Sequence, residues 1–246
     1  MAGLFRYSGN KVRLLKHYRS PPPGTKRVVE PYLGSGSYML LGSALPGLGF
    51  EANGDVVAMW NFLKSTTPTE LRDLAVAVED EKRKGSQPSV KDMNLPLGPR
   101  TYVRVNCTSV VVGQLKSWRI YPQHRLPVED TIGLLPRLKD VEVVHGDPRR
   151  LYVPEDGDLL FIDPPYAGTT GGYEEKGGSN HERGFDTRGV EEIIARRKGP
   201  VIFTHGDGAS ELYPGHPWEV VSRRKVPNVR KGGTIDRTEW VAYVGW

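Results

Sequence analysis

Short apolar runs recur along the chain and alternate with segments whose apolar residues have helical spacing. The runs predict strands at residues 27–29, 49–51, 141–145, 159–162 and 201–205. The helical spacing predicts helices at residues 38–45, 56–64 (with Asp55 as N-cap), 69–84 and 190–197. Strands that alternate with helices are typical of a mostly parallel sheet. We therefore predict an α/β fold, a Rossmann-like sheet with helices on both faces.

Residues 65–138 interrupt this alternation. The segment is charged and punctuated by prolines, and its stretch TYVRVNCTSVVVGQLKSWRIYPQHR mixes polar, basic and aromatic residues without a deep apolar period. We expect a mostly helical inserted module with a polar working surface, although an ordinary surface insertion would have the same composition. Residues 1–64 and 139–246 then form the main domain.

The composition narrows the class of protein. Of the 246 residues, 37% are apolar, which suffices for a core, and no apolar run approaches the length of a membrane span. The first residues lack the apolar segment of a signal peptide, and Cys107 is the only cysteine. We therefore expect no membrane partner, no internal disulfide and no Cys/His zinc site. The expected location is the cytoplasm of a bacterial or phage-infected cell.

The net charge of +5 suits an anionic partner. Basic residues crowd the segment VVSRRKVPNVRKGGTIDRTEWVAYVGW, whose Gly-Gly pair between strand-like runs predicts a hairpin with a basic tip. Nucleic-acid contact explains this charge, and so does protection of an exposed strand edge against aggregation. Both explanations stay open at this point.

The stretch LLFIDPPYAG ends a buried strand on a charged residue. Residues 159–162 are continuously apolar, so both faces of that strand should be covered. Pro164 and Pro165 cannot donate to a ladder, so the strand ends at Asp163, and Tyr166 follows at once. In open α/β sheets ligands bind at the carboxyl ends of the strands. We therefore expect a rigid carboxylate, a carbonyl and an aromatic ring at the ligand edge.

A second ligand signal lies in VVEPYLGSGSYMLLGS, where a strand ends on Glu30 and Gly34-x-Gly36 leads into a helix. Two glycines allow a ligand to approach the backbone, but Met39 stands where a dinucleotide fingerprint has its third glycine. A smaller nucleotide-like ligand fits better. The acids that follow strand ends should converge on one crevice: Glu30, Glu51, Asp147 and Asp163.

Taken in order, these motifs resemble those of the Dam-type (α-group) DNA adenine-N6 methyltransferases. FRYSGNK resembles the opening motif of that family, EPYLGSGS its donor-binding loop, EANGDVVAMWNFLK its second motif and DPPY its catalytic motif. RRKVPNVRKGGTIDRTEWVAYV resembles its closing hairpin, whereas residues 65–138 match weakly. The second motif usually has Asp where Glu51 stands, and Asn53 offers an alternative register.

The resemblance implies a Rossmann-like methyltransferase sheet, S-adenosylmethionine as cofactor, no metal, and residues 65–138 as the target-recognition domain. It implies a catalytic group of Asp163, Pro164, Pro165 and Tyr166 that holds the N6 amine of a flipped adenine. The implied donor-binding residues are Tyr7, Ser8, Gly9, Lys11, Glu30, Pro31, Gly34, Ser35, Gly36, Glu51, Asn53, Asp147 and Asp163.

The expected partner is double-stranded DNA. Candidate contacts in the inserted module and the closing hairpin are Arg104, Asn106, Lys116, Arg119, Arg224, Lys225, Arg230 and Lys231. Methylation of cytosine N4 or of RNA stays open, because the amino groups have the same geometry. A non-catalytic nucleic-acid-binding subunit of the same fold is a further alternative, and both a monomer and a weak dimer are compatible with the sequence.

Overall fold

The computed structural model describes residues 4–5, 11–85, 88–108, 117–165, 187–227 and 234–246. Within this part of the chain a seven-stranded sheet has the order β3-β2-β1-β4-β5-β7-β6. Its strands are β1 (Arg27–Glu30), β2 (Gly47–Glu51), β3 (Val141–His145), β4 (Asp158–Ile162), β5 (Val201–His205), β6 (Trp218–Pro227) and β7 (Thr234–Val244). All pairings are parallel except those of β7, which runs antiparallel to both β5 and β6.

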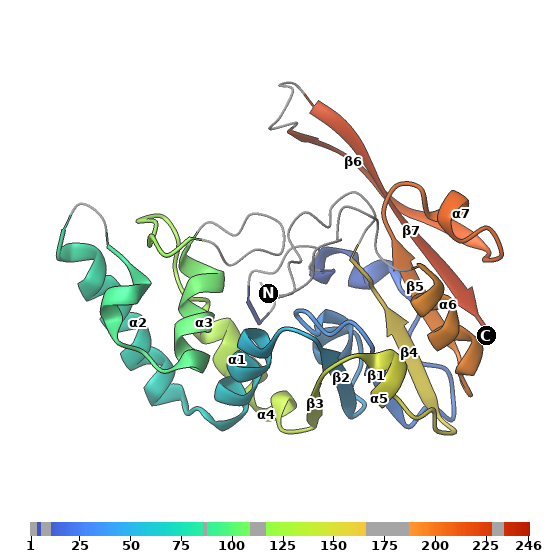
Figure 1. The fold of residues 1–246 in the computed structure, drawn as a ribbon, viewed down its shortest axis with the longest axis horizontal. Helices are drawn as coiled ribbons and strands as arrows, with labels where there is room; N and C mark the ends of the chain where they lie inside the picture. Colours follow the sequence, from blue (N-terminus) through green and yellow to red (C-terminus); the bar gives the residue numbers. More distant parts are fainter. Residues whose placement is uncertain (1–3, 6–10, 86–87, 109–116, 166–186, 228–233) are drawn as a thin grey trace.

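The helices connect these strands and cover the sheet (Figure 1). They are α1 (Gly54–Ser65), α2 (Pro68–Arg83), α3 (Leu97–Cys107), α4 (Val128–Leu138), α5 (Pro148–Leu151), α6 (Thr187–Arg196) and α7 (Ala209–Leu212). Three short turns are η1 (Val12–His17), η2 (Tyr38–Gly42) and η3 (Val90–Met93), of which η2 is π-helical. In the described residues, no helix has the length and apolarity that crossing a membrane requires.

Both faces of the sheet are buried, as continuous apolar strands predict. Successive strand residues point to opposite sides, so Val28 and Leu159 join one core cluster while Val29 and Leu160 join the other. The first cluster packs under η2, α1, α3 and α4, and the second under α6. The predicted α/β fold, a Rossmann-like sheet with helices on both faces, is confirmed.

Local sequence explains where the helices begin. Thr67 and Glu70 form a reciprocal capping box at the start of α2, with Pro68 in the first helical turn. Helix α1 is capped by Asn53, whose side chain accepts from the Asp55 amide at 3.0 Å. The predicted cap, Asp55, was therefore wrong by two residues: Asp55 lies inside the first turn, where a carboxylate favours the positive end of the helix.

The helices of residues 65–138 share the core of the sheet. Side chains at 101–108 are all buried, and Tyr102 and Val105 belong to the same cluster as Val28. Gly98 permits this contact, because a Cβ there would meet Phe62 of α1 at 2.6 Å. The expectation of a polar working surface along the stretch that begins at 101 is therefore wrong for α3, which packs against α1.

Candidate active site

Asp163 lies directly after β4 and is held from two sides. The Lys11 ammonium donates to Asp163 Oδ2 at 2.8 Å and lies 2.8 Å from Oδ1. The Thr204 hydroxyl donates to Oδ1 at 3.0 Å. Lys11 and Thr204 are buried, whereas 21% of the Asp163 side chain is exposed. A partly accessible carboxylate with fixed orientation can accept hydrogen bonds from a polar ligand.

The β4–β5 register brings Thr204 to this place. Ile162 pairs with Phe203, so the next residues on the two strands, Asp163 and Thr204, emerge side by side at the carboxyl edge. Pro164 is buried and Pro165 is half-buried. The fixed φ angles of the two prolines restrict movement of the backbone next to Asp163. Tyr166, the last of the four predicted catalytic residues, lies outside the described residues.

The glycine loop follows β1 at the same edge. Gly34 and Gly36 have φ values of 46° and 59°, in the left-handed region that favours glycine. Helix α1 packs beneath the loop: the Trp60 indole donates to the Gly34 carbonyl at 3.1 Å, and a Cβ on Gly36 would meet the same ring at 2.7 Å. Ser35 and Pro31 are buried within this loop. The loop is therefore built tightly against the protein.

Two carboxyl groups flank the loop: Glu30 is buried and Glu51 is half-buried. Glu30 accepts from the Met39 amide at 2.8 Å, and burial together with the charge of Asp163 raises the pKa of Glu30 to about 8. Glu51 accepts from the Asn53 amide at 2.8 Å. Burial raises the pKa of Glu51 to about 7, although the amides of Asn53, Gly34 and Ala52 oppose the rise. Both carboxyls lie beside the loop, where a nearby cation would favour their ionised forms.

The other two predicted donor-binding residues of this edge have local partners. Asp147 follows β3 and caps α5, and it binds the Arg149 guanidinium at 2.6 Å, which lowers the pKa of Asp147. Asn53 caps α1. The four acids thus follow the carboxyl ends of neighbouring strands, as predicted. The charge of Asp163 contributes to the raised pKa of Glu30. Asp147 instead accepts hydrogen bonds from Arg149.

Three residues near Asp163 escaped the sequence reasoning. Thr204 and His205 end β5, and the same argument from strand ends that selected Asp163 applies to both. Burial lowers the pKa of His205, while the charge of Asp163 opposes the shift. Tyr18 is buried, and burial followed by the charge of Asp163 raises the pKa of its hydroxyl. Nothing in the local pattern around Tyr18 indicates this position.

Of the predicted nucleic-acid contacts, Arg104 and Asn106 were wrong. Asn106 is fully buried and donates to the Tyr102 carbonyl at 2.9 Å. The Arg104 guanidinium is buried and stacks on Trp118 at 3.8 Å. Both side chains build the junction between α3 and its neighbours, because residues 101–107 of α3 are all buried.

Arg119, Arg224 and Lys225 are exposed, as a surface contact requires. The remaining predicted site residues lie outside the described residues, namely Tyr7, Ser8, Gly9, Lys116, Arg230 and Lys231. The described residues contain no cluster of three or more His, Cys, Asp or Glu side chains arranged to hold a metal ion.

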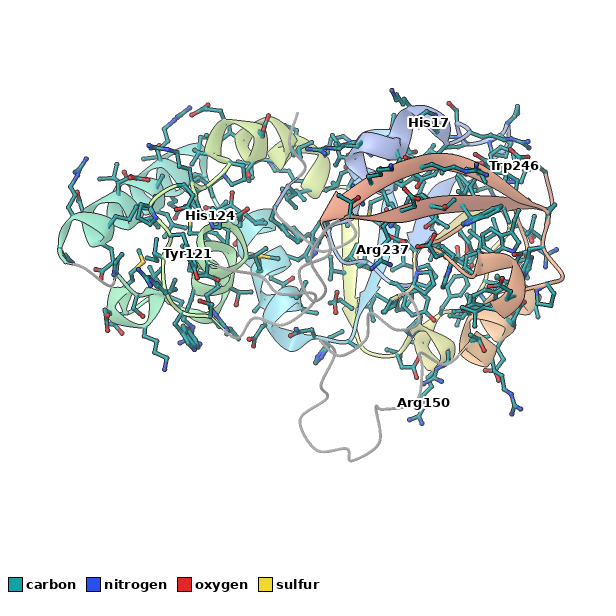
Figure 2. All side chains as sticks on the ribbon, turned by 90° about the horizontal axis from the view of Figure 1, so that it is seen from above. His17, Tyr121, His124, Arg150, Arg237 and Trp246 are labelled. Carbon is teal, nitrogen blue, oxygen red and sulfur yellow. The ribbon has the colours of Figure 1, made fainter. Side chains whose placement is uncertain are left out.

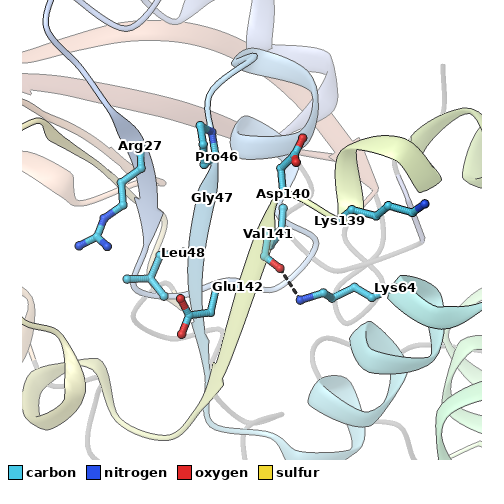
Figure 3. A pocket seen from close by; sticks show the side chains of 9 residues that line it. All are labelled: Arg27, Pro46, Gly47, Leu48, Lys64, Lys139, Asp140, Val141 and Glu142. Atoms are coloured by element: carbon cyan, nitrogen blue, oxygen red, sulfur yellow. Dashed lines mark hydrogen bonds between the residues drawn. The ribbon is translucent and has the colours of Figure 1, made fainter.

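A pocket of about 390 Å³ opens at the opposite edge of the sheet (Figure 3). Its walls include Arg27, Gly47 and Val141, which begin β1, β2 and β3. Arg27 is bound to the buried Asp158 at 2.6 Å, and the Lys64 ammonium donates to the Val141 carbonyl. Both cations are thus bound to protein groups of the amino edge. The carboxyl edge carries Asp163 with its two partners and the glycine loop, and it is the candidate active site.

No protein family model matches the chain, and no curated protein matches it. Solved structures with a similar arrangement include the C-terminal domain of precorrin-6Y C5,15-methyltransferase from Rhodobacter capsulatus (12% identity, 97% of this chain and 94% of that chain, TM-score 0.35). An rRNA methylase from Streptococcus thermophilus matches at 11% identity over 94% of this chain and 93% of its own, with a TM-score of 0.34. Trm5b from Pyrococcus abyssi matches at 12% identity over 95% of this chain, with a TM-score of 0.36.

The chain spans 46% of the Trm5b chain, less than half its length. The fold class rests on the strand order and strand directions given above. Fold and site together define an α/β protein whose carboxyl edge carries a glycine loop, the buried Glu30 and half-buried Glu51 carboxyls, and the segment Asp163-Pro164-Pro165.

Proposed function

We propose that this chain transfers a methyl group from S-adenosylmethionine to N6 of a flipped adenine in double-stranded DNA. The observation that carries the proposal is Asp163, fixed by Lys11 and Thr204 at the carboxyl edge of β4, next to β1 and its glycine loop. The ordered motifs that resemble Dam-type enzymes support the choice of reaction and of DNA.

The residues around the glycine loop fit the proposed donor. Its ammonium requires a carboxylate, which Glu30 offers, and its ribose hydroxyls require an acceptor at the end of β2, which Glu51 offers. Positive φ at Gly34 and Gly36 lets the backbone approach a ligand closely. When bound, S-adenosylmethionine supplies an electrophilic methyl group on a sulfonium.

Asp163 and the Pro164 carbonyl orient the amine that accepts this methyl group. The lone pair of adenine N6 is delocalised into the ring, so the amine is a poor nucleophile. Two acceptors for its N–H groups would turn the lone pair toward the methyl group and offset the positive charge that develops on nitrogen. Fixed geometry matters because methyl transfer requires an in-line approach. As the N–C bond formed, the C–S bond of the donor would break and its sulfur would leave as a neutral thioether. The methylated amine would then release one N–H proton to water, which restores a neutral product.

Lys11 occupies this carboxylate in the structure. Its ammonium contacts both oxygens of Asp163, whereas Thr204 contacts Oδ1 alone. An incoming amine therefore competes with Lys11 for Oδ2 and leaves the Thr204 bond intact. We propose that Lys11 holds the Asp163 carboxylate in its orientation until the target amine takes over one oxygen. Tyr166 stacks on the flipped base in this proposal, a contact worth ~1–3 kcal/mol.

The proposal is tested by Asp163→Asn with Asp156→Asn as the control, because Asp156 is exposed and lies in the turn before β4. Methyl transfer should fall at least roughly 10²-fold in Asp163→Asn, since an amide cannot accept with both atoms or balance positive charge. Donor affinity, measured by calorimetry, should stay close to that of the unchanged protein. Turnover of Asp163→Asn equal to that of Asp156→Asn would refute the mechanism, and no donor binding by the unchanged protein would favour a non-catalytic role.

A further inference from the structure

The last two strands extend beyond the rest of the sheet. Strands β6 and β7 have 10 and 11 residues, whereas β1 and β2 have 4 and 5. Strand β5 pairs with β7 only from its start to His205, which lies opposite Trp240. Residues 222–227 and 234–239 therefore pair only with each other, past the carboxyl end of β5. We name these two segments the overhanging ribbon; Figure 1 shows it extending away from the sheet.

The overhanging ribbon lies on the side of the candidate active site. His205, at which β5 ends, follows Thr204, the residue bound to Asp163. Figures 1 and 2 agree that the ribbon reaches back toward the middle of the molecule, and in Figure 2 Arg237 lies between the inserted helices and the outer end of the sheet. A ligand on the ribbon is thus placed over the edge that holds Asp163.

The described side chains of the overhanging ribbon are rich in cations. Arg223, Arg224 and Lys225 are exposed on β6, and 44% of the Arg237 side chain is exposed on β7. Arg224 pairs directly with Arg237 in the register, so both side chains leave the same face, with Cβ atoms about 5 Å apart. Like charges in this position destabilise a ribbon. An anion bound between the two guanidinium groups would remove their mutual repulsion and would be attracted by both charges.

The acids beside the two arginines are not close enough to compensate this pairing strongly. Glu239 lies 3.8 Å from Arg224, and Asp207 lies 3.7 Å from Arg237. Both distances exceed those of charge-assisted hydrogen bonds. The Arg237–Asp207 pair is also exposed on both sides, and exposed ion pairs contribute little. Arginine guanidinium groups match phosphate oxygens in a bidentate geometry.

We infer that the overhanging ribbon binds the sugar–phosphate backbone of a duplex, with Arg224 and Arg237 as a paired phosphate clamp. This inference rests on the proposed function for the identity of the ligand, and it adds the surface that positions the duplex over Asp163. A two-stranded ribbon also has the width that a major groove admits. The clamp positions the duplex without reading its sequence, because phosphate contacts carry no base information.

Protection of an exposed strand edge explains the same charges in another way, because β6 is the last strand of the sheet. The two explanations differ in what the cations do. A protective role implies self-association when they are removed and an unchanged affinity for DNA. A clamp implies weaker, less salt-dependent binding of DNA by a protein that stays monodisperse.

The test compares Arg224→Gln/Arg237→Gln with Lys26→Gln/Lys139→Gln. Lys26 and Lys139 are exposed and precede β1 and β3, at the opposite edge of the sheet, so the control removes the same charge far from the ribbon. Duplex binding would be measured by fluorescence anisotropy over a range of salt concentrations. Loss of two phosphate contacts should reduce the slope of log K against log salt by about 2 and weaken binding roughly 60-fold at ~0.1 M salt. The control pair should behave like the unchanged protein.

Equal slopes for the two double variants would overturn the clamp. If light scattering shows that the ribbon variant self-associates while its affinity for the duplex is unchanged, the cations protect the strand edge and do not form a phosphate clamp. Donor affinity measured on the same samples confirms that each variant is folded. If the unchanged protein binds no duplex, the DNA part of the proposed function fails and the clamp fails with it. If it binds duplex RNA with the same loss in the ribbon variant, the clamp stands and DNA is the wrong substrate.

Discussion

Replacing Thr204 by Val removes the hydroxyl that donates to Asp163 and that also lies 3.4 Å from the Ile162 carbonyl. Thr204 is fully buried, and valine has nearly the same shape. The lost bond, from the hydroxyl to Asp163 Oδ1 at 3.0 Å, ends on a carboxylate, and such bonds contribute about 1.5–3 kcal/mol. If the whole of this hydrogen-bond energy stabilises the transition state, in which charge develops on the target amine, its loss slows methyl transfer about 10- to 150-fold.

The assay is single-turnover methyl transfer at saturating donor and DNA, with donor affinity measured separately. We expect the rate constant to fall and the donor affinity to stay constant, since the Thr204 hydroxyl donates to Asp163, which orients the target amine in this proposal. Thr204→Ser is the matched control: it keeps the hydroxyl, loses one methyl group, and should restore most of the rate despite a lower melting temperature.

Thr204 is thus a positioning residue in this account, acting through Asp163. Two results would refute that reasoning. A Thr204→Val protein with unchanged rate would show that Lys11 alone fixes the carboxylate. A Thr204→Ser protein as slow as Thr204→Val would show that packing, and not the hydrogen bond, supports Asp163.

Three further outcomes are expected. Gly36→Ala should abolish donor binding and lower stability by at least ~1–2 kcal/mol, because alanine is strained at φ +59° and its Cβ would lie 2.7 Å from the Trp60 ring. Calorimetry measures donor binding and thermal unfolding measures stability. Normal donor binding would contradict the role of the glycine loop as the donor site. Donor binding at pH 6.5 should release protons and tighten as the pH rises, because the pKa values of Glu30 and Glu51, about 8 and about 7, leave both carboxyls partly protonated until a cationic ligand favours ionisation. Titrations in buffers of different ionisation enthalpy measure the proton release, which Glu30→Gln should reduce. Zero release would count against these two residues as donor ligands. Asn106→Ala should lower stability by about 1–3 kcal/mol without changing DNA affinity, since a buried side-chain hydrogen bond is lost. Denaturant unfolding measures the stability and fluorescence anisotropy measures the DNA affinity. Weaker DNA binding at unchanged stability would support the DNA contact that the sequence predicted for Asn106.

The sequence predicted the central strands well because their apolar runs are bounded by clear breakers. Pro164 and Pro165 fix the end of β4, and the residue before them becomes the carboxylate at the ligand edge. The glycine loop was predicted for a similar reason, since left-handed backbone at Gly34 and Gly36 requires glycine. Such features depend on local chemistry, and local chemistry is what a sequence displays directly.

Contacts between distant segments were beyond local patterns. Lys11 and Asp163 are 152 positions apart, so only the resemblance to a family connected them with one ligand. Thr204 becomes part of the site through the β4–β5 register, which no local pattern specifies. The same argument from strand ends that selected Asp163 would nevertheless have selected Thr204 and His205.

Polar residue type proved a poor guide to exposure in α3. Arg104 and Asn106 resemble base-reading residues, yet both are buried because α3 lies against α1 and finds its hydrogen-bond and stacking partners inside the protein. One signal was available: Gly98, the second residue of the helix, has no side chain, and a Cβ there would collide with Phe62. A glycine at a helix start before mixed polar and apolar residues is compatible with close helix packing.

The most direct measurement of the central claim is the identity of the methylated base. The protein would be incubated with unmethylated duplex DNA and isotope-labelled S-adenosylmethionine, and the DNA digested to nucleosides for mass spectrometry, beside a parallel reaction with Asp163→Asn. The account requires labelled N6-methyldeoxyadenosine from the unchanged protein and its loss in the variant. Labelled N4-methyldeoxycytidine, or no labelled nucleoside from a protein that binds the donor, would contradict it.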